Sequence, residues 1–310
     1  MKKFLILTLS AVLLLTASAC GAAQTPAEPE GPAQPEIAAE EEKKPVEQTI
    51  FSSWDDFSPQ ETASTPDPGE TKENWDLSRA DAYPEDDDCS EAEFFEKWMT
   101  VEGLTTDDLD ARGCRQLIIA ALRKDSQIAT TTICYEKQED GSWAQAEGFE
   151  RMRGSVGRRG VSHDRHAGDE TSPGGIWQIG TAFGNEEKPE GLKMPWRDVT
   201  PNSYWIGDDS KYYNTWQESD DPDLPEIDFD EGEHLCEYTE SYALAAVVRF
   251  NMAPHMKNGH GSAIFFHVSR GATAGCIGLP YDNFRKTLLW LDPDMNPYML
   301  VTGYENETNW

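Results

Sequence analysis

A cysteine and a histidine in the C-terminal third of the chain have the types and spacing of a nucleophile and its base. Cys276 is framed by small residues, and His267 lies nine positions earlier, directly after the apolar run SAIFF. A thiol attacks carbonyl carbons as its thiolate, so a cysteine with a pKa of ~8.5 needs a nearby base or cation. A histidine within hydrogen-bond reach supplies one. The stretch FHVSRGATAGC therefore predicts either acyl-transfer chemistry or a core strand that runs into a loop.

The residues just before the cysteine indicate how developing charge could be stabilised. Ala274 and Gly275 are small enough for the backbone to approach a substrate carbonyl closely. The amides of Gly275 and Cys276 are therefore candidate donors to an oxyanion.

The cysteine count gives a second reason to single out Cys276. Five cysteines follow Cys20, and an odd number in an exported protein leaves at least one thiol without an internal bridge. Cys276 is our candidate for that thiol. Cys89 and Cys114 flank a predicted helix and could form a disulfide, whereas Cys134 lies in a predicted strand and is expected to be a small buried hydrophobe. The pairing of these residues and Cys236 stays open.

The N-terminus predicts export and a lipid anchor. Residues 1–20 carry two lysines, an apolar core and small residues that lead to Cys20, which is typical of a secretory signal. Ala17-Ser18-Ala19-Cys20 resembles a bacterial lipobox, whose cysteine is lipidated; the alternative is an ordinary signal with a chance cysteine at the cut. We expect a protein anchored to the bacterial cell membrane by lipid, outside the cytoplasm.

The next segment, residues 21–88, predicts a disordered, acidic, Pro-rich tether. Residues 21–100 hold 22 Asp and Glu against 5 Lys and Arg, which accounts for −17 of the net charge of −31. Such a charge excludes nucleic acid as a natural partner.

The remaining chain predicts a mainly β domain. Ser90 and Glu93 form a capping-box pattern before FFEKWM, which indicates a helix within a lead-in at 89–111. Residues 281–291 predict another helix, because Phe284, Leu288 and Leu291 share a face. Segments rich in β-branched and aromatic residues predict strands at 116–122, 128–137, 175–180, 241–250 and 262–268.

The cysteine segment also resembles a known family. SAIFFHVSRGATAGCIGLP is similar to the signature of the L,D-transpeptidase (YkuD-type) catalytic domain, in the branch that reads G-S-A-I-F-x-H, a short loop, then T-x-G-C-x-x-L-P. The stretches GDETSPGGIWQIGTAFG, MPWRDVTPNSYWIGDDSKYYNTW and YALAAVVRFN resemble further parts of this branch, from about Arg115 to Tyr304. The resemblance implies a sandwich-like β catalytic domain, at 112–310, with one or two peripheral helices.

The same resemblance implies the roles of the site residues. Cys276 would be the nucleophile, His267 its base, and Gly275 with Cys276 the oxyanion amides. Thr273 holds the motif's Ser/Thr position and would order the loop or touch the substrate. Two features depart from the commonest family motif: Ala274 stands where that motif has histidine, and its interval from histidine to cysteine is nearly twice the nine residues here.

Other charged residues near the motif have two interpretations each. Arg270 is assigned to the carboxylate of a stem peptide or to solvent, and weaker candidates for that carboxylate are Arg158, Arg159, Arg165 and Lys211. His260 assists at the site or is a solvated loop residue. His163 and His166 could pair on a metal with Asp164 or Asp169, but no third ligand has familiar spacing, so we expect no metal.

These residues predict peptidoglycan remodelling. The expected activity is an L,D-transpeptidase that forms 3→3 cross-links through a cysteine acyl-enzyme on tetrapeptide stems, with no cofactor. The alternatives are an L,D-carboxypeptidase or amidase that uses the same site, and a catalytically inactive wall-binding lipoprotein.

Overall fold

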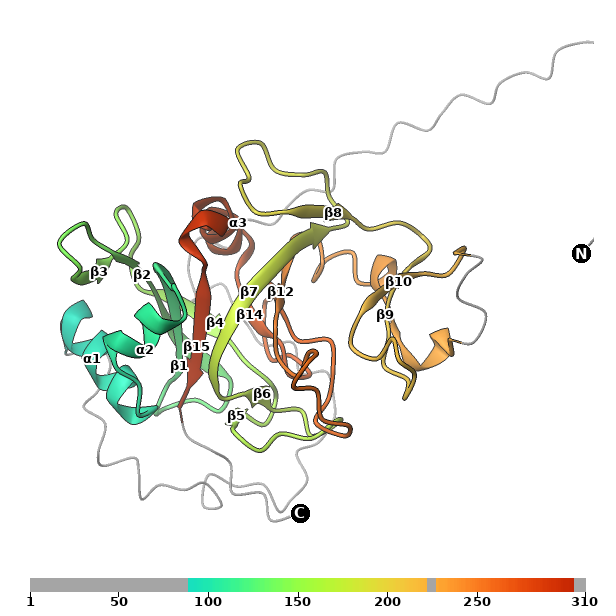
Figure 1. Ribbon diagram of the computed structural model, residues 1–310, viewed down its shortest axis with the longest axis horizontal. Helices are drawn as coiled ribbons and strands as arrows, with labels where there is room; N and C mark the ends of the chain where they lie inside the picture. The colour runs from blue at the N-terminus through green and yellow to red at the C-terminus, as the bar shows by residue number, and fades with distance from the viewer. Residues whose placement is uncertain (1–88, 222–226, 304–310) are drawn as a thin grey trace, which may run out of the picture. The chain divides into compact units, whose positions relative to one another are not determined.

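The computed structural model describes residues 89–221 and 227–303 (Figure 1). The predicted signal peptide, the predicted tether and Cys20 lie outside the described residues. The described part is mainly β, as the sequence predicts.

Two of the helices, at 91–101 and 281–290, form where capping and apolar periodicity predict them. Ser90 Oγ accepts a hydrogen bond from the Glu93 amide, and the Glu93 carboxylate accepts one from the Ser90 amide at 2.8 Å, so the predicted capping box is confirmed. Such a box satisfies amides that have no partner within the helix. The helical segments are α1 (Glu91–Val101), α2 (Thr106–Ala111), η4 (Phe229–Glu231), η5 (Leu235–Glu237), α3 (Tyr281–Trp290) and η6 (Pro293–Met295).

Strands make up most of the regular structure, and the first of them has the bounds that the sequence predicts. The strands are β1 (Gln116–Leu122), β2 (Ala129–Lys137), β3 (Trp143–Gln145), β4 (Met152–Ser155), β5 (Val161–Ser162), β6 (Ser172–Pro173), β7 (Gly175–Gly184), β8 (Trp196–Asp198), β9 (Ser203–Trp205), β10 (Trp216–Glu218), β11 (Glu233–His234), β12 (Ala245–Val248), β13 (Phe265–Val268), β14 (Ile277–Leu279) and β15 (Tyr298–Thr302).

Eight of these strands close into a ring. The order is β1-β15-β7-β12-β13-β14-β4-β2, and β1 pairs again with β2, while β3 and β8 extend the sheet outside the ring. The pair β13–β14 is parallel, with Phe266 opposite Ile277 and His267 opposite Gly278. This register places the C-terminal end of the loop between β13 and β14, and with it Cys276, beside Phe265.

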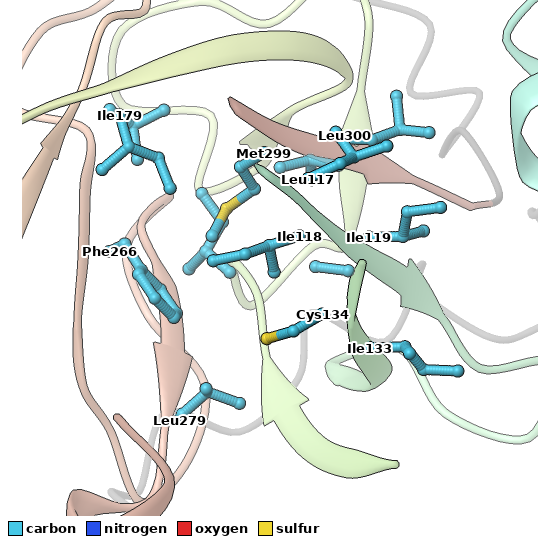
Figure 2. Packing of buried hydrophobic residues seen from close by; sticks show 14 of the residues in the cluster. Leu117, Ile118, Ile119, Ile133, Cys134, Ile179, Phe266, Leu279, Met299 and Leu300 are labelled. Carbon is cyan, nitrogen blue, oxygen red and sulfur yellow. The ribbon is translucent and has the colours of Figure 1, made fainter. Parts of the chain in front are cut away.

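The apolar runs of the central strands are buried on both faces of the sheet, so the pattern does not alternate with polar residues. Phe266 belongs to the larger cluster and packs on Phe284 of α3 with ring centroids 4.7 Å apart. Figure 2 shows part of this cluster, where Phe266 and Leu279 lie across from Ile118 and Cys134. Burial of each such side chain contributes roughly 1.5–3 kcal/mol.

The opposite face of the same strands forms a second cluster that includes the predicted nucleophile. Its buried members are Phe183, Trp205, Leu235, Tyr242, Ala245, Val247, Ala263, Phe265 and Cys276. Three of the strands that flank this face, β9, β10 and β11, form a small separate sheet that the sequence did not predict.

Cys89 and Cys114, which could have formed a disulfide, are not joined by one. The thiol of Cys114 is buried and donates to the Gln116 carbonyl at the start of β1. The Cys89 carbonyl accepts a hydrogen bond from Arg151. Cys134 is buried, as predicted.

Candidate functional site

His267 on β13 and Cys276, which ends the loop that leads into β14, face the same side of the sheet. Side chains alternate along a strand, so Phe265 and His267 share a face of β13. Cys276 packs with Phe265 in the second cluster. Tyr242 contacts this face twice, with its ring edge-on to Phe265 at 5.3 Å and to His267 at 5.4 Å between centroids.

The thiol of Cys276 is held in a closed environment. Its Sγ donates to the Ala263 carbonyl at 3.3 Å and accepts from the Phe265 amide at 3.4 Å, and the residue is 7% exposed. Burial raises the pKa of Cys276 to about 12; the charge of Glu233 adds to the rise, whereas the Phe265 amide and Arg165 oppose it. The resting form at neutral pH is therefore the thiol.

His267 is neutral in the same environment. Burial lowers the pKa of His267 to about 4, although hydrogen bonds to the backbone of Val268 and Ser241 oppose the change. Nδ1 lies 2.7 Å from the Val268 carbonyl, which can only accept, so Nδ1 carries the proton of that bond. A neutral imidazole retains one lone pair that can accept a proton, and the lowered pKa makes this imidazole a weak base. No hydrogen bond joins His267 to Cys276 within residues 89–221 and 227–303.

Thr273 organises the loop around the cysteine. Its hydroxyl donates to the Cys276 carbonyl at 2.6 Å and accepts from the Gly275 amide at 3.2 Å. Its own amide donates to the Val156 carbonyl, which ties the loop to the neighbouring segment. The Gly275 amide, which the sequence assigns to the oxyanion, is therefore engaged by Thr273 in this structure. Of the predicted roles for Thr273, the contacts show the ordering of the loop.

Gly275 occupies a position that disfavours any side chain. Its φ of +145° is one that side chains rarely adopt, and a Cβ there would lie 3.0 Å from the Thr171 carbonyl oxygen and 3.3 Å from Arg165 Nη2. The glycine thus lets a guanidinium approach the residue that precedes Cys276.

Arg165, which the sequence analysis named as a weaker candidate for binding a carboxylate, lies beside Gly275. It is 5% exposed, and its Nε and Nη1 are buried without any hydrogen-bond partner. The nearest carboxylate is that of Asp169, whose Oδ1 lies 3.8 Å from Nε. Burial lowers the pKa of Arg165, while the charges of Asp169 and Cys276 oppose that change. A buried donor without a partner costs about 1–3 kcal/mol, so such groups are few in folded proteins.

Glu233 and Tyr242 complete the polar surroundings, and the sequence analysis did not identify them. The Tyr242 hydroxyl donates to Glu233 Oε2 at 2.5 Å. Burial raises the pKa of Glu233, although the Tyr242 hydroxyl opposes the rise. Burial also raises the pKa of Tyr242 well above its ordinary value. Glu233 lies in an acid-rich stretch, DFDEGEHLCEYTE, where no local pattern distinguishes it from its neighbours.

Several predicted charged residues lie outside this buried group. Arg270 is exposed, and its Nη1 lies 4.0 Å from the Glu240 carboxylate. Arg158 is paired with Glu170 at the surface. Their predicted roles in substrate binding stay predictions, as does that of Lys211, which lies 4.8 Å from the Tyr212 ring centroid.

The loop histidines are arranged differently from the predicted pair. His163 Nε2 and Glu102 Oε2 form a hydrogen bond of 2.7 Å. His260 stacks on His166 with ring centroids 5.0 Å apart. Asp169 accepts from the His166 amide instead of facing an imidazole.

A pocket of about 350 Å³ lies on the same side of the sheet as the second cluster, and its lining does not include Cys276. It is lined by Thr181, Phe183, Arg197, Trp205, Thr215, Trp216, Val247, Arg249 and Met252. Two of its lining residues, Phe183 and Trp205, also contact Phe265 edge-on.

Among the described residues, no helix has the length and apolar character needed to span a bilayer. Comparisons of the chain with protein-family models, with curated protein sequences and with solved structures found no match.

Proposed function

We propose that this chain is a peptidoglycan L,D-transpeptidase that uses Cys276 as its nucleophile and His267 as its base. The sequence resemblance suggests the family. The observation that supports the chemistry best is the buried guanidinium of Arg165, whose Nε and Nη1 make no hydrogen bond, beside the backbone that carries the Cys276 thiol. A structural cysteine does not require a buried cation next to it, whereas a reacting thiol does.

The reaction transfers an acyl group in two steps. The Cys276 sulfur bonds to the carbonyl carbon of the third residue of a tetrapeptide stem, and the bond from that carbon to the nitrogen of the terminal D-Ala breaks. His267 takes the thiol proton and gives it to the departing D-Ala amine. An amine of a neighbouring stem then attacks the thioester, which forms a 3→3 cross-link and returns the proton through His267 to the sulfur.

The acid–base properties of the resting site determine when the proton moves. With pKa values of about 12 for Cys276 and about 4 for His267, a resting thiolate–imidazolium pair is strongly disfavoured. We therefore propose that the proton leaves the thiol only as the sulfur attacks. Before that step, substrate binding breaks the hydrogen bond from the thiol to the Ala263 carbonyl. Such a site would protect an exported thiol from oxidation until substrate arrives.

Arg165 supplies the positive charge that neutral His267 lacks. In the proposed reaction it stabilises negative charge that develops on the sulfur and on the attacked carbonyl oxygen. Preorganised donors of this kind contribute on the order of 10²–10³ in rate. Thr273 holds the loop between β13 and β14 in the conformation that keeps Gly275 against this guanidinium.

The remaining parts of the proposal follow the sequence. The domain would have the sandwich-like L,D-transpeptidase fold and need no cofactor, since thiol, base and guanidinium supply the chemistry. The lipid at Cys20 and the acidic tether would place it between membrane and wall, with stem peptides as its partners.

Two other outcomes use the same fold. Water in place of the acceptor amine gives a carboxypeptidase, and cleavage of a protein–wall bond gives an amidase. A catalytically inactive wall-binding lipoprotein is the alternative from another class, and the buried thiol of Cys276 is the observation that favours it.

The deciding experiment is intact-mass spectrometry of the purified chain with tetrapeptide muropeptides, beside Cys276→Ala. A thioester adduct on Cys276 with release of D-Ala is expected, and dimers or tripeptides identify the acceptor. If the folded chain forms no adduct and shows no turnover of the muropeptides, that result would exclude the transpeptidase and favour the wall-binding lipoprotein.

A further inference from the structure

Three potential metal ligands that are far apart in the sequence meet at the surface of the domain. Asp164 and His166 lie in the loop between β5 and β6, and His260 lies in the loop between β12 and β13. One ligand atom from each of the three side chains lies within 4.8 Å of the other two. The two imidazole rings stack with an interplanar angle of 26°.

The first loop is held in place by a buried carboxylate. Asp169 accepts hydrogen bonds from the amides of His166 and Thr171, and it is 5% exposed. These bonds fix the backbone of the segment that carries Asp164 and His166 without using either side chain.

The second loop is held by a buried amide. Asn251 Nδ2 donates to the carbonyls of Lys257 and Gly261, at 2.9 and 2.8 Å, and Asn251 Oδ1 accepts from the Lys257 amide. His260 lies inside the turn that these bonds close. A backbone hydrogen bond of 2.9 Å from the Ala167 amide to the Gly259 carbonyl joins the two loops.

The ligand atoms themselves are not used by the protein. Within the described ranges, the Asp164 carboxylate and the imidazole nitrogens of His166 and His260 make no hydrogen bond or ion pair, and the bonds of Asp164 and His166 run through their backbone amides. Asp164 and His166 are exposed and His260 is partly so, which leaves the atoms accessible from solvent.

We propose that Asp164, His166 and His260 form a binding site for a divalent transition-metal ion of the zinc class. Two imidazoles and one carboxylate, with a fourth position open to solvent, are a ligand set that suits Zn²⁺ and is unfavourable for Mg²⁺ or Ca²⁺, which require mostly oxygen. Ligand atoms around a tetrahedral Zn²⁺ lie roughly 3.4 Å apart. The observed spread of up to 4.8 Å therefore needs a contraction of up to about 1.4 Å. Side chains that solvent can reach make such a change by small rotations.

An ion at this site would link the two loops near the Cys276 thiol. The first loop carries Arg165 between the two proposed ligands, and the second leads directly into Gly261 and Ala263. Arg165 Nη2 would lie 3.0 Å from a Cβ at Gly261, and the Ala263 carbonyl accepts the Cys276 thiol. The proposed ion thus bridges the segments that hold the guanidinium and the thiol, and its binding does not depend on the proposed reaction.

The test uses the full chain without an affinity tag, metal-free and kept reduced by a phosphine. Zn²⁺ binding is measured by titration calorimetry and by the thermal unfolding midpoint, with Mg²⁺ as a second probe. The variants are His166→Ala, His260→Ala and Asp164→Asn, and the matched control is His255→Ala, an exposed histidine of the same loop as His260.

We expect Zn²⁺ to raise the unfolding midpoint of the wild type and of His255→Ala, and Mg²⁺ to leave it unchanged. Each of the three site variants is expected to lose at least tenfold in affinity for Zn²⁺. Because the wild type also has cysteines that bind zinc, a Co²⁺ spectrum without thiolate-to-metal charge transfer is the second expected result. Equal Zn²⁺ affinity in the wild type and all three variants, or no binding by the folded wild type, would overturn the proposal.

Discussion

The guanidinium of Arg165 lies directly against the backbone of Gly275, the residue before the proposed nucleophile. A Cβ at Gly275 would be 3.3 Å from Arg165 Nη2 and 3.4 Å from Nη1. This contact connects two loops that are about a hundred residues apart in the sequence. It places a positive charge beside the site and limits the size of the side chain at position 275.

The first prediction concerns this contact. Gly275→Ala should lower the free energy of unfolding by about 1–3 kcal/mol, because the φ of +145° and the nearby Thr171 carbonyl both resist a side chain. Denaturant unfolding measures the loss. Ala274→Ser, at the exposed neighbouring position, should remain within about 0.5 kcal/mol of the wild type. Equal stability of the two variants would show that the glycine is not required.

The second prediction tests the charge of Arg165. Alkylation of Cys276 by iodoacetamide, followed by peptide mass mapping, should rise about tenfold per pH unit between pH 7 and 10, because the pKa of the thiol is about 12. Arg165→Gln removes a charge that lowers this pKa, so the rate at pH 9 should fall about tenfold, as for a rise of one pKa unit.

Arg158→Gln is the control for that experiment, since Arg158 lies in the same segment but pairs with Glu170 at the surface. Cys276 in Arg158→Gln should be alkylated at the wild-type rate. A profile for Arg165→Gln that overlays the wild-type profile would remove the guanidinium from the proposed mechanism, while the test of the reaction itself would remain independent.

The third prediction concerns the hydroxyl of Thr273. Thr273→Val should cost about 1–3 kcal/mol of stability, because the Cys276 carbonyl and the Gly275 amide lose the same partner. Thr273→Ser retains the hydroxyl and should recover most of the loss. Unfolding midpoints in urea compare the three proteins. If the serine and valine variants are equally unstable, the methyl group of Thr273 matters and the hydroxyl does not.

The fourth prediction follows from the buried, neutral His267. Its pKa is lowered from 6.5 to about 4, so the unfolded chain binds the extra proton first as the pH falls. The stabilising contribution is therefore complete above pH 6.5 and is lost as the pH falls through 4, by up to about 3 kcal/mol. The free energy of unfolding, measured from pH 7 to pH 4, should fall more steeply in the wild type than in His267→Gln.

His255→Gln, which removes an exposed histidine, serves as the comparison for that slope. It should retain the wild-type dependence on pH. Parallel curves for the wild type and His267→Gln would mean that His267 is not buried as a neutral ring.

Local patterns in the sequence determined much of the secondary structure. The capping box at Ser90, the strand at 116–122 and the helix face of Phe284 and Leu288 formed where they were predicted. Each depends on interactions among residues a few positions apart, which the sequence displays directly. The strand predicted at 241–250 is shorter, Ala245–Val248, because the flanking residues form turns that the apolar pattern does not reveal.

The tertiary structure alone decided which side chains meet at the candidate site. The burial of Arg165, the pair Glu233–Tyr242 and the group Asp164, His166 and His260 all depend on how distant loops come together when the sheet closes. The sequence identified Cys276 and His267 by type and spacing. The sequence could not show that the Cys276 thiol donates a hydrogen bond to the Ala263 carbonyl. The burial, the hydrogen-bond partners and the pKa of a side chain are properties of the packed chain.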